Sequence, residues 1–198
     1  MKIKGKLLGA FLSVVVVIAI GAVLSALQLG KLYDAGRSVA LDGAPEVVAI
    51  KDLEITVLEA HVQLEQVITG RTSMDEAQQI TGKLESAQSH AEEILGGEVA
   101  GMESAFVQSD SDARMKLQSA VQLLGVLKEL STQIVSQYED KGQVASVLVD
   151  QLARQGDLFH QTMEGLVDTV QARMDTLTGQ LESTYNQAVT YMAGAVGG

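Results

Sequence analysis

The chain has 198 residues, of which 46% are hydrophobic, 4% aromatic and 20% charged, and its formal net charge is −11. One proline and few aromatic side chains are typical of long helices and disfavour a β-sandwich or a β-barrel. The lack of cysteine excludes disulfides, cysteine-ligated metals and thiol catalysis. An acidic chain with only 14 Lys and Arg has no basic face for nucleic acid, so no nucleic-acid partner is expected.

The first segment is a run of 24 uncharged residues, 7–30, preceded by Lys2, Lys4 and Lys6. As a helix it would be about 36 Å long, enough to cross a hydrocarbon core of about 30 Å. The lysines place residues 1–6 in the cytoplasm and the following chain outside. A cleaved signal peptide is the alternative, but the run exceeds a usual signal-peptide core and no clear cleavage site follows. The sequence therefore predicts an uncleaved transmembrane helix over 7–30.

The first exported helix is predicted over 45–68, because Pro45 suits a first helical turn and apolar residues recur every three or four positions. A second apolar face lies beside the main stripe, and one core does not need it. We therefore expect a parallel homodimer in which this helix and the last one supply most of the contact, with a broad intramolecular stripe as the alternative. The main stripe is Val47, Ile50, Glu54, Val57, His61, Leu64 and Ile68, and the second face is Leu53, Ile55, Leu58 and Val62.

Three further helices are predicted. The second helix starts at a capping box of Ser73 and Glu76 and ends at the glycine pair 96–97. The third helix ends at Gly142. The fourth helix continues to about Met192 without a proline. Residues 98–112 are irregular, and nothing indicates a strand. The stripes are Ala77, Ile80, Leu84, Ala87, Ala91 and Ile94, then Leu117, Ala120, Leu124, Leu127, Ile134 and Tyr138, then Leu148, Leu152, Phe159, Met163, Leu166, Val170, Met174, Leu177 and Leu181.

Four amphipathic helices joined by short turns predict an all-α fold, an antiparallel four-helix bundle over residues 31–191. Residues 192–198 are uncharged but too short to span a membrane. They are expected to be either the start of a second crossing or a non-native tail.

The basic N-terminus MKIKGKLLGAF, the single long crossing and a bundle of about 160 residues resemble the N-terminal sensory half of bacterial methyl-accepting chemotaxis proteins. The segments DLEITVLEAHVQLEQVITG and ESAQSHAEEIL are similar to helical sensor modules of related receptors. The resemblance implies a periplasmic module on the bacterial inner membrane. It also implies a homodimer that binds a small molecule or a periplasmic binding protein and signals through its last helix.

Three histidines and two glutamates are the candidate metal ligands. His61 lies on the first exported stripe, with Glu54 two turns before it and Glu65 one turn after it. His90 and His160 border the stripes of the second and fourth helices, near the depth of Glu54 when about 1.5 Å is counted per residue. Imidazole and carboxylate groups suit zinc, iron or copper, and two facing histidines could hold a non-covalent haem. Hydrogen-bonded boundary histidines are the alternative, so no cofactor is required, and free imidazole would also permit pH sensing.

Two arginines are the candidate ligand-binding residues, because guanidinium groups bind carboxylates through two hydrogen bonds. Arg71 is in the predicted turn after the first exported helix, and Arg154 is two to three turns into the last one. Only these two could approach one another, and solvated surface arginines are the alternative.

Motifs typical of enzymes are missing: the P-loop, G-x-S-x-G, H-E-x-x-H and the dinucleotide fingerprint. No enzymatic activity is expected. Two functions stay open: the sensing module of a chemoreceptor-like transmembrane protein, or a membrane-anchored bundle that binds metal or haem or serves as a structural subunit without signalling output.

Overall fold

The computed structural model describes residues 30, 31, 33, 36, 43–71, 73–99, 102–103, 107 and 109–197. This part of the chain is all-α apart from two very short strands, which confirms the all-α part of the prediction. It divides into one compact unit over Leu41–Arg173 and a second that holds the described residues before and after it. Among the described residues no helix is both long and apolar enough to cross a membrane. The crossing predicted over 7–30 lies outside them except for Gly30.

Helix α2, Ala44–Ile68, begins with Pro45 in its first turn, as predicted, but its buried face differs from the predicted stripe. Val47, Glu54, His61 and Ile68 are only half-buried, at one edge of the core face. Leu53, assigned above to a second face, is instead part of the core, and only the other members of that face are exposed. The buried residues are Glu46, Ala49, Ile50, Leu53, Val57, Ala60, Leu64 and Val67.

Helix α3, Met74–Gly96, follows a turn at Gly70 and has the start and end that the sequence predicts. The Ser73 hydroxyl accepts a hydrogen bond from the Glu76 amide, and the Glu76 carboxylate accepts one from the Ser73 amide. Gly97 ends the helix with φ of 87°, which is accessible to glycine without strain. All six residues of the predicted stripe are buried.

Two-residue strands, β1 (Glu98–Val99) and β2 (Met102–Glu103), pair antiparallel after α3. The expectation that this region contains no strand was therefore wrong, although the hairpin is minimal. Close to it in sequence, the Val107 amide donates a 2.7 Å hydrogen bond to the carboxylate of Glu46, which is fully buried in the first turn of α2. A buried carboxylate is tolerated when it accepts such a hydrogen bond.

Helix α4, Ser111–Lys141, begins where Asp110 accepts hydrogen bonds from the amides of Asp112 and Ala113, and it ends at Gly142 with φ of 66°. Helix α5, Ser146–Gly197, is a single helix of 52 residues. Its side chains Leu152, Phe159, Met163, Leu166 and Val170 are buried, whereas the predicted stripe residues Leu148, Met174, Leu177 and Leu181 are only half-buried.

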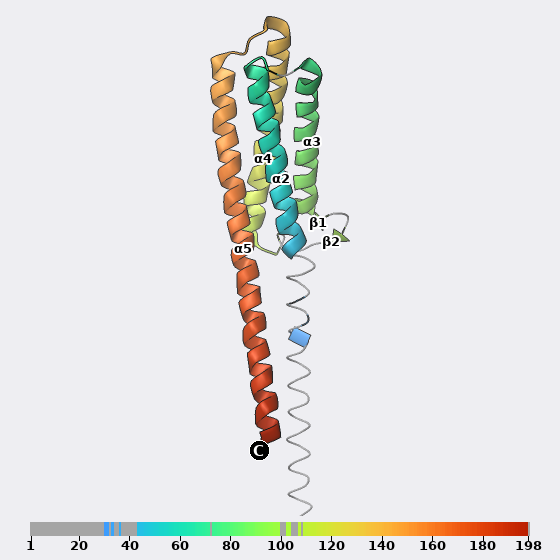
Figure 1. Cartoon of the computed structure of the whole chain (residues 1–198), viewed down its shortest axis with the longest axis vertical. Helices are drawn as coiled ribbons and strands as arrows, with labels where there is room; N and C mark the ends of the chain where they lie inside the picture. Colours follow the sequence, from blue (N-terminus) through green and yellow to red (C-terminus); the bar gives the residue numbers. More distant parts are fainter. Residues whose placement is uncertain are drawn as a thin grey trace, which may run out of the picture. The chain divides into compact units, whose positions relative to one another are not determined.

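Within the unit Leu41–Arg173, α2 packs on α3, α3 packs on α4, and α2 also contacts α4. Figure 1 shows these three helices side by side. Polar contacts between helices supplement the apolar core. Lys83 donates to Gln63 across α3 and α2 at 3.2 Å, and the Thr81 and Ser131 hydroxyls lie 3.3 Å apart across α3 and α4. The first part of α5 contacts both α2 and α4, through the groups described next.

Candidate functional site

The candidate site is a groove between α2 and α5 with a cavity of about 340 Å³, close to the lower limit of typical ligand pockets at about 300 Å³. It combines an apolar floor with two carboxylates and two imidazoles. The lining residues are Glu54, Val57, Leu58 and His61 from α2, and Gly156, Asp157, Phe159 and His160 from α5.

One end of the groove is closed by the contact between His61 and Gly156. A Cβ atom built on Gly156 would lie 2.7 Å from Cε1 and 2.8 Å from Nδ1 of the His61 ring. These distances are shorter than van der Waals contact, so a larger residue would displace the imidazole. On its outer side, His61 Nε2 lies 3.6 Å from Glu65 Oε1 on the same helix. Gly156 therefore allows α5 to approach α2 closely enough for His61 to form a wall of the groove.

The other end of the groove is marked by a contact between an imidazole of α5 and a carboxylate of α2. His160 Nδ1 lies 2.9 Å from Glu54 Oε1, and these side chains are 64% and 25% exposed, respectively. Glu54 and His61 are seven residues apart on α2, which corresponds to about 10 Å. Contacts at both levels therefore hold α5 against α2, with the cavity between them.

The predicted metal ligands are separated into local pairs. Glu54 meets His160, His61 meets Glu65, and His90 lies 3.6 Å from Glu93 on α3. In the described part of the chain, no group of three or more His, Cys, Asp or Glu side chains is arranged to hold a metal ion. Glu54, His61 and His160 therefore line the same groove. The described residues do not, however, form the cluster of ligands that the metal interpretation requires.

The two candidate arginines do not line the groove. Arg71 is exposed in the turn between α2 and α3, and Arg154 is exposed on α5. None of the lining residues is a lysine or an arginine. The groove thus offers no guanidinium group for a carboxylate ligand.

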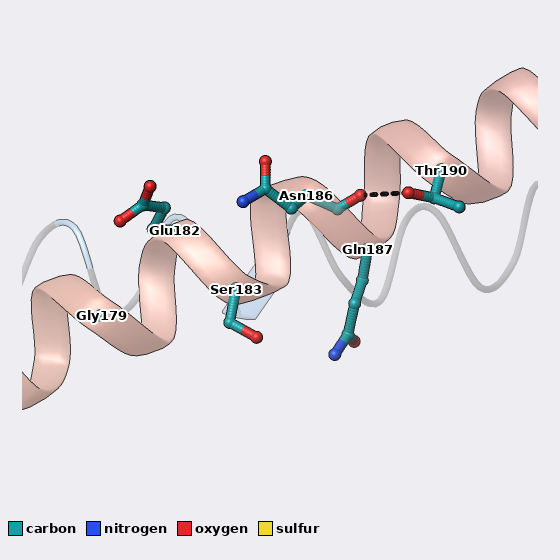
Figure 2. Close-up of a pocket in the computed structure, with 6 residues that line it drawn as sticks. All are labelled: Gly179, Glu182, Ser183, Asn186, Gln187 and Thr190. Carbon is teal, nitrogen blue, oxygen red and sulfur yellow. Dashed lines mark hydrogen bonds between the residues drawn. The ribbon is translucent and has the colours of Figure 1, made fainter.

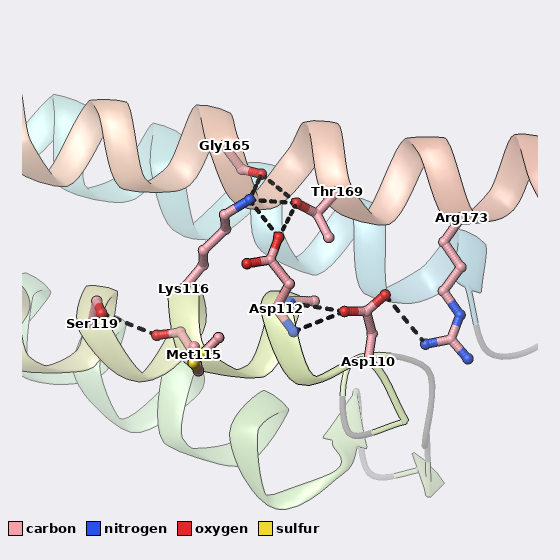
Figure 3. A network of polar contacts seen from close by, with 9 residues as sticks. Asp110, Asp112, Met115, Lys116, Ser119, Gly165, Thr169 and Arg173 are labelled. Atoms are coloured by element: carbon pink, nitrogen blue, oxygen red, sulfur yellow. Dashed lines mark hydrogen bonds and ion pairs between the residues drawn. The ribbon is translucent and has the colours of Figure 1, made fainter.

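A second polar cluster joins the first turns of α4 to α5 (Figure 3). Lys116 Nζ lies 2.8 Å from Asp112 Oδ2, 3.1 Å from the Gly165 carbonyl oxygen and 2.6 Å from Thr169 Oγ1. The hydrogen bond from Lys116 lowers the pKa of the Asp112 carboxyl below its ordinary value, and Thr169 adds a smaller effect of the same sign. Nearby, Arg173 donates to Ser109 at 2.7 Å. All of these groups satisfy one another, so we regard the cluster as an attachment between helices.

A shallow hollow also lies on the later part of α5, in the other unit (Figure 2). It is lined by Gly179, Glu182, Ser183, Asn186, Gln187 and Thr190, all from one helix. The Thr190 hydroxyl donates to the Asn186 carbonyl oxygen at 2.8 Å, within the helix itself. These residues lie on successive turns of one helix, so side chains from different elements do not converge on the hollow. The α2–α5 groove is therefore the stronger candidate site.

Sequence reasoning missed Gly156 and Asp157, which supply part of the α5 wall. Gly156 in the middle of a helical pattern was a usable signal, because an interior glycine weakens a helix and is favoured where a neighbouring side chain packs against the backbone.

The chain has no significant match to a protein-family model, to a curated protein or to a solved structure. The groove and the helices that form it are therefore the basis for inferring function.

Proposed function

We propose that the chain is the ligand-sensing extracytoplasmic module of a chemoreceptor-like transmembrane signal transducer. The observation that carries this proposal is the position of the groove. Half of its wall belongs to α5, and α5 is one helix that continues from the groove to Gly197. A ligand that changes how α5 contacts α2 acts directly on this continuous helix. In the family that the sequence resembles, the last helix of the bundle carries the signal toward the membrane.

In this proposal, α2, α3, α4 and the first part of α5 form an antiparallel four-helix bundle. The contacts of α5 support it: its residue 156 meets residue 61 of α2, whereas residue 160 meets residue 54, so the two helices run in opposite directions. The attachment of α5 to α4 through Lys116, Gly165 and Thr169 completes the set of neighbours.

The proposed location of the bundle is the periplasm, with residues 7–30 as the anchor in a bacterial inner membrane. Its support is the uncharged run and the lysines before it. Mass spectrometry of protein isolated from membranes tests this directly and should find the N-terminal segment intact. A mature N-terminus between Val23 and Leu29 would show cleavage and contradict the anchor.

The proposed homodimer uses exposed apolar side chains of α2. Val48, Ile55 and Val62 follow one another at seven-residue spacing, and their exposures are 59%, 53% and 44%. Seven-residue spacing repeats one side of a helix every two turns, as along the seam where two helices pair. Because the same patch would face itself across a two-fold axis, a second copy of this chain is the partner that fits.

A receptor chimera tests the signalling proposal. The chain would replace the corresponding sensory part of a chemoreceptor, ahead of that receptor's second crossing and kinase-control domain. Gly156→Ala should shift the resting kinase activity, because it displaces His61 and changes the α2–α5 contact. Gly125→Ala, on α4 with no atom within 4 Å of the added Cβ, is the matched control. Equal resting activity in the parent and both variants would contradict the proposal, provided that all three chimeras reach the membrane.

A further inference from the structure

The α2–α5 groove has the charge pattern of a site for a cation. Glu54 uses Oε1 to contact His160, and its second oxygen, Oε2, has no hydrogen bond or ion pair with the described residues. The Asp157 carboxylate, on the opposite helix, likewise makes no hydrogen bond or ion pair with the described residues. Glu54 and Asp157 are the only acidic residues that line the groove, and no lysine or arginine lines it.

The floor of the same groove is apolar. Val57 and Phe159 are 3% exposed each, and Leu58 extends the apolar surface toward solvent with 59% of its area exposed. A simple hydrated metal ion gains nothing from such a floor, and no group of three metal-binding side chains is present in the described part of the chain. A ligand that uses both features needs a positively charged group joined to an apolar body.

We infer that the groove binds a small organic ammonium ion whose charged group lies between Glu54 and Asp157 and whose apolar body covers Val57, Leu58 and Phe159. This inference rests on the proposed sensing function and names its ligand class. An ammonium group supplies several hydrogen-bond donors, which match the free carboxylate oxygens. The formal net charge of −11 also attracts cations and repels anions at long range.

An isosteric series of probes tests the inference on the full chain in a non-ionic detergent. Benzylammonium, benzyl alcohol and benzoate have the same ring and differ in charge, and n-butylammonium replaces the ring by an alkyl chain. Isothermal titration calorimetry should detect saturable binding of the two ammonium ions, with benzyl alcohol at least about tenfold weaker and benzoate weaker still. The inference is overturned if benzoate or benzyl alcohol binds as tightly as benzylammonium, or if neither ammonium ion binds.

Conservative variants localise the binding. Glu54→Gln removes the charge but keeps an oxygen that can accept from His160, and Asp157→Asn does the same on α5. Each should weaken benzylammonium binding by about tenfold, as expected for the loss of a charged hydrogen-bond partner. Glu59→Gln and Asp168→Asn remove exposed charges from the same two helices outside the groove and should leave the affinity unchanged. Equal weakening by all four variants would reveal general attraction to an acidic protein and overturn the site.

Binding and signalling are separated by this design, because calorimetry needs no signalling domain. Ammonium binding with a chimera that never responds to groove variants would contradict the proposed function alone. A responsive chimera whose sensory chain binds no ammonium ion would contradict the ligand class alone.

Discussion

Gly156 is the residue on which the geometry of the groove depends most directly. Its missing side chain leaves room for the His61 ring, which a Cβ would approach to 2.7 Å. Gly156→Ala should lower the free energy of unfolding by about 1–3 kcal/mol, because added atoms in a packed contact force side chains or backbone to move. Gly125→Ala, where the new Cβ meets nothing within 4 Å, should instead raise it by about 0.5–1 kcal/mol through better helix propensity. Thermal and chemical unfolding followed by circular dichroism measures both.

A double variant separates the steric effect from other consequences of the substitution. His61→Ala removes the ring that the new Cβ would meet, so Gly156→Ala should be far less destabilising in that background. If the loss caused by Gly156→Ala is the same with and without His61, the contact is not its cause and the prediction is wrong.

Glu46 is the buried charged residue of α2, and its carboxylate accepts a hydrogen bond from the Val107 amide. Glu46→Ala would leave that amide without its acceptor, at a cost of about 1–3 kcal/mol for a buried donor. Glu46→Gln keeps an acceptor oxygen and should be milder. Amide hydrogen exchange reports the contact itself, and exchange at Val107 should become faster in Glu46→Ala. Unchanged exchange at this position would show that the carboxylate does not protect the amide.

At the scale of elements, Lys116 attaches α4 to α5 and holds the pKa of the Asp112 carboxyl below its ordinary value of 3.8. A group whose folded-state pKa is lowered contributes stability above its unfolded pKa and loses that contribution as pH falls through the folded pKa. Lys116→Met should therefore raise the pKa of Asp112 toward 3.8 and reduce the loss of stability on acidification below about pH 4. Carboxyl NMR titration measures the first effect and acid unfolding the second.

Lys128→Met is the control for this element-scale prediction. Lys128 belongs to the same helix but is twelve residues from Lys116, about 18 Å along the axis. The substitution Lys128→Met should therefore leave the Asp112 titration unchanged. An identical Asp112 titration curve in the parent protein and in Lys116→Met would exclude Lys116 as the group that lowers this pKa.

The elements themselves were predictable where local signals agreed. For α3, the capping box of Ser73 and Glu76, the stripe from Ala77 to Ile94 and the terminal Gly97 all indicate one helix and one buried face. For α2, two apolar patterns interleave. The small side chains Ala49 and Ala60 weigh little in a hydropathy pattern although they are buried, so the predicted stripe was rotated to one edge of the core face.

Contacts between residues far apart in the chain were predictable only in part. Counting residues from the helix ends placed Glu54 near the depth of His160, and the two do meet. The other long-range contacts could not be predicted. Burial of Glu46 depends on the Val107 amide, 61 positions away, and the role of Gly156 depends on His61 being its neighbour. No local pattern encodes such pairings. The two-residue strands are equally invisible, because strand alternation needs about four residues to be recognised.

At the scale of the whole molecule, the lack of cysteine makes the chain a ready background for testing the proposed dimer. Single substitutions Ile55→Cys and Val62→Cys place thiols on the exposed seam of α2, where a two-fold axis would bring each residue close to its copy. A disulfide forms when the Cα atoms are within about 7 Å, a separation that paired helices provide only at seam positions. Oxidation of membranes should therefore yield covalent dimers of both variants.

Ser89→Cys on α3 and Gln122→Cys on α4 are exposed controls and should stay monomeric on denaturing gels. Efficient cross-linking at all four positions would indicate random collision, and none at Ile55 or Val62 would leave the seam without a partner copy; either result contradicts the dimer.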